Sequence, residues 1–164
     1  MAATNTSDRI WEKLLKKLRQ DYPSFSFKAD TSNHWSPETK QVFYKKNQPQ
    51  PIRMWSLLHE LAHALLTHTS YNSDFELIKL EVKAWEEAKS LGLAYDVVID
   101  EEHVQDCLDT YRDWLHKRST CPTCELRSAQ KNEHTYECFN CGTSWQVSSA
   151  RFARAYRRTA TLKK

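Results

Sequence analysis

Residues 52–67 have the sequence IRMWSLLHELAHALLT, in which apolar side chains face nearly every side of a helix. The preceding segment, 47–51, reads Asn-Gln-Pro-Gln-Pro and is a strong helix breaker. The pattern therefore predicts a helix of about four turns that is buried over most of its surface. Burial of polar groups costs free energy unless they have partners, so the two histidines and the glutamate inside this helix require an explanation.

The explanation that we favour is a metal site. His59 and His63 are four residues apart, so their imidazoles project from one face of the helix and can bind one metal ion. Glu60 lies about 100° further round the helix, where it can act as a general base on a water molecule beside the metal. This is the logic of the HExxH metallopeptidases. The alternative is an ordinary helix that happens to carry two histidines.

A third ligand can be sought by helical phase in the next predicted helix, residues 75–91, which we expect Gly92 to end. At about 100° per residue, Glu81 lies about 40° from Leu77, inside the apolar arc. A carboxylate on the core face is costly unless it is paired or binds a metal. We therefore predict Glu81 as the third ligand, with Glu87 in reserve and the fourth position open to water.

The sequence HELAH at residues 59–63, followed by EVKA at residues 81–84, resembles the ImmA/IrrE family of small, gluzincin-like zinc metallopeptidases. The resemblance covers roughly residues 40–95. It implies that His59, His63 and Glu81 bind zinc and that Glu60 is the base. Members are intracellular and often cleave one specific regulatory protein, commonly a transcriptional repressor.

The sequence departs from that family at Trp85, where relatives often have a small polar residue. A second resemblance is to the SprT-like proteases, which act on proteins attached to DNA and also place a zinc ribbon after the HExxH helix. They normally take a third histidine from a His-Gly element, which this chain lacks. The nearest downstream histidine is His68, only about one turn beyond His63.

Four of the five cysteines form two C-x2-C pairs with the spacing of a zinc ribbon. Four thiolates make a closed tetrahedral site, so we expect a structural zinc ion whose binding supplies the folding free energy of residues 119–148. Segments 133–137 and 143–147 are predicted strands of the ribbon. The lone Cys107 is predicted to be a small buried hydrophobe. The predicted zinc ligands are Cys121, Cys124, Cys138 and Cys141.

Composition narrows the functional classes. The 164 residues are 40% hydrophobic and 27% charged, as in an ordinary globular protein. The two glycines are too few for a glycine-rich phosphate loop or a dinucleotide fingerprint. No apolar run approaches the roughly 18 residues that a membrane span requires, so no membrane partner is expected. The beginning of the chain lacks a secretory leader pattern and the cysteine pairs suit a reducing compartment, so we expect a cytoplasmic protein.

Charge is unevenly distributed about the net value of +3. Residues 74–113 contain twelve acidic and four basic side chains, whereas residues 142–164 contain six basic side chains and no acidic one. A helix predicted over 149–161 would present a basic face that can neutralise nucleic-acid phosphates, with Tyr136, Phe139 and Trp145 as stacking surfaces. The alternative is a solvated tail beside aromatics that fill a small core. The arginines concerned are Arg151, Arg154, Arg157 and Arg158.

The predicted fold is α+β: a compact zincin-like domain over 1–118, a zinc ribbon over 119–148 and a basic, helical tail over 149–164. In the first domain we expect helices at 8–19, 52–67, 75–91 and 100–117, with paired strands at 24–29 and 40–45.

The predicted function is a zinc-dependent endopeptidase that acts on a specific intracellular protein, regulatory or DNA-associated. We expect an extended substrate to add to the strand at 40–45. Tyr71, His68 and His34 are unranked candidates to stabilise the oxyanion. The alternative function is a ribbon-based adaptor for nucleic acid or protein, with an inactive or structural HExxH site.

Overall fold

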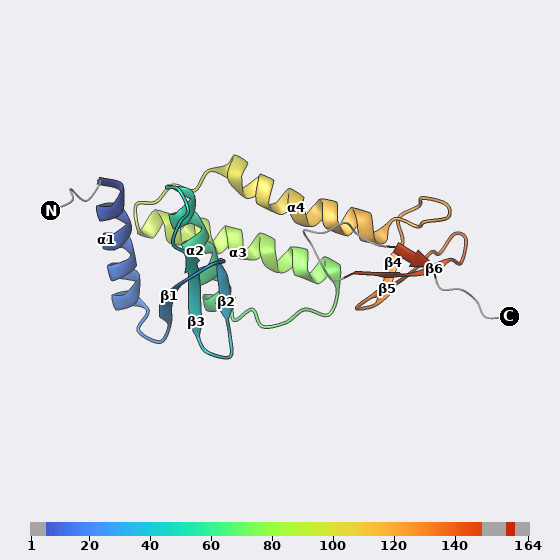
Figure 1. The fold of residues 1–164 in the computed structure, drawn as a ribbon, viewed down its shortest axis with the longest axis horizontal. Helices are drawn as coiled ribbons and strands as arrows, with labels where there is room; N and C mark the ends of the chain where they lie inside the picture. The colour runs from blue at the N-terminus through green and yellow to red at the C-terminus, as the bar shows by residue number, and fades with distance from the viewer. Residues whose placement is uncertain (1–5, 149–156, 160–164) are drawn as a thin grey trace. The chain divides into compact units, whose positions relative to one another are not determined.

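The computed structural model describes residues 6–148 and 157–159, in which four helices and two small sheets form the predicted α+β fold (Figure 1). The elements are α1 (Thr6–Asp21), β1 (Ser26–Asp30), β2 (His34–Ser36), β3 (Gln41–Lys45), α2 (Ile52–Leu65), α3 (Asp74–Ala94), α4 (Glu101–Ser119), β4 (Ala129–Asn132), β5 (Thr135–Glu137), β6 (Ser144–Val147) and β7 (Arg157–Thr159). No helix within these residues is long and apolar enough to cross a membrane.

The chain forms two compact units, which are described separately. The first comprises residues 1–69 and 82–101, and the second comprises residues 70–81 and 102–164. Helix α3 contributes residues to both. The domain boundaries predicted at residues 118 and 148 stay predictions.

The first unit contains a three-stranded sheet in the order β1-β3-β2. The two predicted strands do pair, but in parallel, because the polar loop between them contains the additional strand β2. This strand has three half-buried residues and is too short to show an alternating pattern. The expectation that a substrate adds to the strand at 40–45 is wrong. This strand is β3, which lies in the centre of the sheet, and a strand with partners on both sides offers no edge to a substrate.

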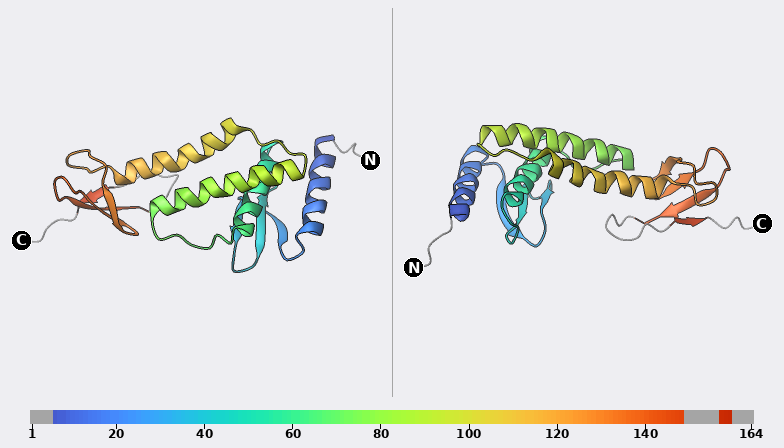
Figure 2. Two further views of the ribbon diagram at one scale, coloured as in Figure 1. Left: turned by 180° about the vertical axis from the view of Figure 1, so that it is seen from behind. Right: turned by 90° about the horizontal axis from the view of Figure 1, so that it is seen from above.

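Helices α1 and α2 both lie against this sheet (Figure 2). Helix α1 buries Trp11 and three leucines, and the Trp11 ring meets the Tyr44 ring of β3 edge-on at 5.0 Å. Helix α2 buries seven side chains, including His59, as its apolar sequence predicts. It ends two residues before the predicted limit, where Thr67 adopts a left-handed conformation with φ of 54°.

The end of α3 differs from the prediction. Gly92 lies inside the helix, where an added Cβ would stand 2.4 Å from the carbonyl oxygen of Val97, so glycine is required by close packing. The chain leaves the helix at Asp96, whose φ is 56°. The N–H of Val97 then donates to the Gly92 carbonyl at 2.8 Å, which closes the helix as a Schellman-type cap does.

The second unit carries the ribbon, whose sheet has the order β4-β5-β6-β7. Strands β5 and β6 lie within the predicted segments, whereas β4 was not predicted. Strand β7 pairs with β6, so residues 157–159 are a strand and not part of the predicted basic helix. Arg151 and Arg154 lie outside the described residues. The prediction that Tyr136 and Trp145 offer stacking surfaces to bases is also wrong, because the two rings stack on each other inside the ribbon core.

Candidate metal centres

Helix α2 presents two imidazoles whose Nε2 atoms converge. The Nε2 atoms of His59 and His63 are 3.2 Å apart. Two imidazole nitrogens bound to one tetrahedral zinc ion, at about 2.05 Å each, would be separated by about 3.3 Å. The spacing of His59 and His63 therefore fits a shared zinc ion.

Glu81 supplies the third donor, a carboxylate oxygen, as the helical phase predicts. Its carboxylate and the two imidazoles each offer a ligand atom, and these atoms all lie within 4.8 Å of one another. One turn after Glu81 on α3, the Trp85 ring stacks on the His59 ring at 4.1 Å. Glu81 is 7% exposed, and Glu87 is not a member of the group found among the described residues.

Glu60 is half-buried on α2 beside these residues and does not belong to the ligand group. This is the separation of roles that an HExxH motif needs, because the base must reach the water without occupying a coordination position. Residues 59, 63 and 81 thus offer three donors, and a tetrahedral ion bound to them would retain one open position.

His68 is a neighbour of the site whose role the sequence did not reveal. Its Nδ1 lies 2.9 Å from Nδ1 of His63, and its carbonyl oxygen accepts a hydrogen bond of 3.1 Å from the Trp35 indole. When Nε2 of His63 binds a metal, its Nδ1 carries the proton and donates to His68, which holds the ring in place. The only sequence signal is a histidine about one turn beyond the motif.

The other two oxyanion candidates have different surroundings. The His34 ring stacks on Phe43 at 4.3 Å, and Tyr71 is 46% exposed. Trp85, the departure from the family pattern, packs against a predicted ligand and so belongs to its immediate surroundings.

The four predicted cysteines form the second candidate centre, with sulfur atoms within 4.8 Å of one another. The Cys121 and Cys141 sulfurs are 3.6 Å apart, and those of Cys124 and Cys138 are 3.5 Å apart. Sulfurs bound tetrahedrally to zinc at about 2.3 Å would be about 3.8 Å apart. The four cysteines therefore fit one zinc ion.

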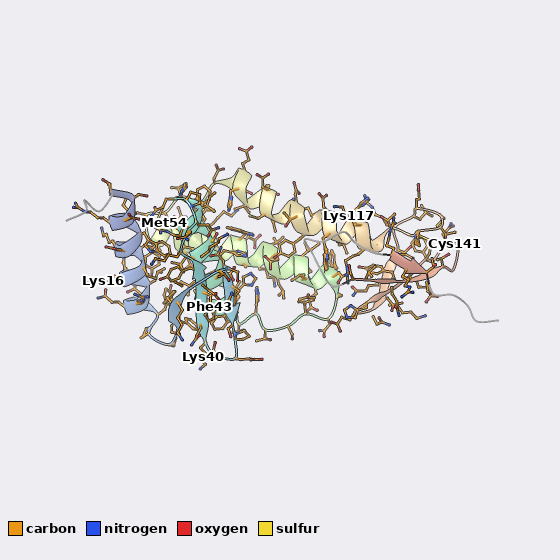
Figure 3. The ribbon with its side chains drawn as sticks, viewed as in Figure 1. Lys16, Lys40, Phe43, Met54, Lys117 and Cys141 are labelled. Atoms are coloured by element: carbon orange, nitrogen blue, oxygen red, sulfur yellow. The ribbon has the colours of Figure 1, made fainter. Side chains whose placement is uncertain are left out.

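The loops lower the pKa of two of these thiols, Cys121 and Cys138. The backbone amide of Leu126 lowers the pKa of Cys124, but burial and the neighbouring Cys138 thiol outweigh it and raise that pKa to about 11. The Thr123 N–H points at the Cys121 sulfur at 3.4 Å. A hydrogen bond from the Ser128 side chain, followed by the Cys141 backbone amide, lowers the pKa of Cys138 to about 6. Figure 3 labels Cys141, in the second loop, where Gly142 adopts a φ of 71°.

Cys107 lies outside this group and is half-buried, with its sulfur 3.6 Å from Nε2 of His103. The expectation that Cys107 is fully buried is therefore wrong.

Comparison with known proteins identifies the family. The model of the Peptidase_M78 family, described as an IrrE N-terminal-like domain, matches residues 20–151. The match includes the HExxH helix, α3 and all four ribbon cysteines. No curated protein and no solved structure gives a significant match. Since the match covers most of the chain, this protein belongs to the Peptidase_M78 family, the ImmA/IrrE-type metallopeptidases that its HExxH motif resembles.

Proposed function

We propose that this protein is a zinc-dependent endopeptidase that hydrolyses peptide bonds in a specific intracellular protein, regulatory or DNA-associated. The observation that carries the proposal is the convergence of His59, His63 and Glu81 within 4.8 Å, in a family of peptidases. A zinc ion held there would supply Lewis-acid chemistry, which polarises a peptide carbonyl and acidifies water.

The side chains around the ion would divide the remaining work. Glu60 accepts the proton of the attacking water and passes it to the departing amine. His68 orients the His63 ring through the Nδ1 contact, and Trp85 fixes the His59 ring by stacking. Because His59 and Glu81 are buried, these groups are held in one geometry before the substrate arrives.

An extended substrate would add to strand β2. This strand is an edge of the three-stranded sheet, and Trp35 within it donates to the carbonyl of His68, the partner of His63. At the opposite edge, the Phe27 carbonyl of β1 accepts a hydrogen bond of 3.0 Å from Arg19 of α1. Main-chain pairing at an edge strand binds a peptide with little dependence on its sequence.

The test is a trapping experiment with Glu60→Gln. The variant should keep its zinc, fail to cleave and retain the substrate protein in a pull-down. Glu86→Gln is the matched control, because Glu86 is an exposed glutamate on α3 outside the ligand group. Cleavage by Glu60→Gln at the wild-type rate would refute the peptidase.

A photo-crosslinking residue introduced into the trapping variant tests the substrate edge. Placed at Ser36 in β2, it should capture the retained protein, and placed at Lys28 in β1 it should not. Capture at Lys28 alone would refute the assignment to β2.

We also propose that the four-cysteine centre binds a structural zinc ion. Its four thiolates leave no open position for chemistry. The buried ribbon core consists of Tyr136, Trp145, Val147, Cys121 and Cys138, which is too small to fold without the metal. All five cysteines are free thiols, which suits a reducing compartment such as the cytoplasm.

A second candidate function, contact with nucleic acid, is favoured by three exposed ribbon side chains. Phe139 is 77% exposed between two metal-site cysteines and offers a stacking surface. Arg157 and Arg158 are exposed on β7, although Arg157 also donates to the Thr120 carbonyl at 2.8 Å. This contact would deliver the peptidase to a DNA-associated protein.

A further inference from the structure

The second unit contains a buried ion pair that the peptidase chemistry does not use. Arg118, in the last turn of α4, is 2% exposed and Asp74, the first residue of α3, is 3% exposed. Nε of Arg118 donates to Oδ2 of Asp74 at 2.6 Å, and Nη2 donates to Oδ1 at 3.3 Å. A buried pair of this kind is tolerated only when its remaining polar atoms also find partners.

The ribbon supplies those partners. The Tyr136 hydroxyl donates to Oδ2 of Asp74 at 2.6 Å, and the Asp74 N–H donates to Oε1 of Gln130 at 2.7 Å. The Arg118 guanidinium also donates to the Glu133 carbonyl at 3.2 Å and to the Ser148 carbonyl. The Trp145 indole donates to the Arg118 carbonyl at 2.9 Å. Ribbon residues thus complete the hydrogen bonding at both ends of the pair.

Three of these ribbon partners depend on the metal site. Tyr136 and Trp145 are core neighbours of Cys121 and Cys138, and Gln130 pairs with Tyr136 across β4 and β5. Without metal, this small core has too little apolar area to fold. The Asp74–Arg118 pair would then lose the partners that complete its hydrogen bonds, and the beginning of α3, which the pair holds, would open.

The same helix carries a predicted zinc ligand. Glu81 lies seven residues, about two turns, after Asp74 on α3, and both residues belong to the second unit. The N-terminal end of α3 is capped locally as well, because the Glu76 N–H donates to the Ser73 hydroxyl at 3.1 Å and the Glu76 carboxylate accepts from the Asn72 N–H at 2.7 Å. The ribbon and this cap together hold the turns that lead to Glu81.

We propose that the four-cysteine ribbon positions Glu81 through the Asp74–Arg118 pair, so that metal in the ribbon raises the affinity of the His59–His63–Glu81 centre for its own ion. The inference rests on the proposed function, in which Glu81 is a zinc ligand. Asp74, Arg118 and Tyr136 are then positioning residues. If the two metal sites are coupled in this way, a defect in the linking network lowers the metal affinity of the His59–His63–Glu81 centre without removing a ligand.

Cobalt binding to the full chain measures this coupling. Zinc is first loaded into the thiolate site, and protection of the thiols from a thiol reagent confirms its presence. Cobalt is then titrated, and its visible absorption reports the nitrogen and oxygen donor site. Asp74→Asn should weaken cobalt binding by on the order of tenfold, within the range of about 5–150-fold that is typical of coupled sites, while the thiols stay protected.

Two further variants keep the test decisive. Tyr136→Phe removes one hydroxyl hydrogen bond to Asp74 while it keeps the ring, and it should weaken cobalt binding by a smaller factor. If Asp74→Asn fails to fold, Tyr136→Phe alone tests the positioning role. Lys131→Ala removes an exposed ribbon ion pair with Glu137 and should leave cobalt binding unchanged.

Glu81→Gln separates the two ways in which the account can fail. If Glu81→Gln weakens cobalt binding while Asp74→Asn and Tyr136→Phe bind like the wild type with protected thiols, the positioning role is refuted and the peptidase proposal stands. If Glu81→Gln itself binds cobalt like the wild type, the ligand set of the peptidase proposal is refuted.

Discussion

The four-cysteine centre and the His59–His63–Glu81 centre hold their donors in different ways. The cysteines come from two short loops within one ribbon, where hydrogen bonds stabilise the thiolates of Cys121 and Cys138. The histidines come from α2, which buries seven side chains, and the glutamate comes from α3, whose Trp85 ring stacks on the His59 ring. The first arrangement closes around an ion, whereas the second leaves a coordination position for a reaction.

This difference predicts opposite consequences of metal loss. The ribbon has few apolar side chains beyond its cysteines, so the ion would supply most of its stability. Helix α2 buries seven side chains, so we expect it to fold without an ion. The predictions below test this contrast, in order of decreasing effect.

The largest effect is expected from Cys138→Ser, which removes a fully buried side chain of the proposed four-cysteine site. Structural zinc contributes about 10 kcal/mol or more to small zinc domains at neutral pH, so the ribbon should lose its fold. Near-ultraviolet circular dichroism of the stacked Tyr136 and Trp145 rings should report the loss. Cys107→Ser, outside the cluster, is the control, and an unchanged spectrum in Cys138→Ser would show that the ribbon does not depend on metal.

The next largest effect concerns Glu60 and Glu81, which should separate catalysis from metal binding. Glu60→Gln should lower kcat by about 10²–10⁴-fold with normal zinc content, because the loss of a general base affects only proton transfer. Glu81→Gln should lower zinc affinity and activity together. Measurements of zinc content and cleavage rate on the same samples distinguish a base from a ligand. Loss of zinc in Glu60→Gln would assign that residue to the ligands.

A smaller effect is expected from His68→Phe. Removal of a hydrogen-bond partner of a metal-binding histidine typically costs about 10–100-fold in metal affinity or activity. Cobalt or zinc titration measures the change, and His34→Phe is the matched control because that ring stacks on Phe43. Equal behaviour of the two variants would remove His68 from the site.

An effect of similar size is expected in nucleic-acid binding by the ribbon surface, which does not involve the peptidase centre. Phe139→Ala should weaken binding to single-stranded DNA by about 1–3 kcal/mol, the contribution of one stacked base. Arg158→Ala should reduce the slope of the logarithm of the binding constant against the logarithm of salt concentration by about one, which corresponds to the loss of about one phosphate contact. Fluorescence anisotropy at several salt concentrations measures both changes, and binding that neither variant alters would refute the ribbon as the contact surface.

The sequence predicted best those features that short-range spacing determines. The i, i+4 histidines, the two C-x2-C pairs and the helical phase of Glu81 each rest on the geometry of one element, and the structure groups these residues as expected. The family match independently confirms the resemblance that the HExxH segment suggested.

Features that depend on tertiary packing were not predicted. Strand β2 is too short to have a periodic signal, and the role of Gly92 depends on the approach of Val97. The tail arginines have helical spacing, but residues 157–159 pair with β6 and are extended. The contacts of His68 with His63 and of Arg118 with Asp74 join residues whose separation in sequence carries no motif.

X-ray absorption at the zinc edge of the fully loaded protein tests the central claim most directly. We predict a sulfur shell at about 2.3 Å together with a nitrogen and oxygen shell at about 2.0 Å. A mild chelator should remove the second shell, with loss of peptidase activity, and leave the first. A fully loaded protein that shows only the sulfur shell would contradict the account, because His59, His63 and Glu81 would then hold no zinc.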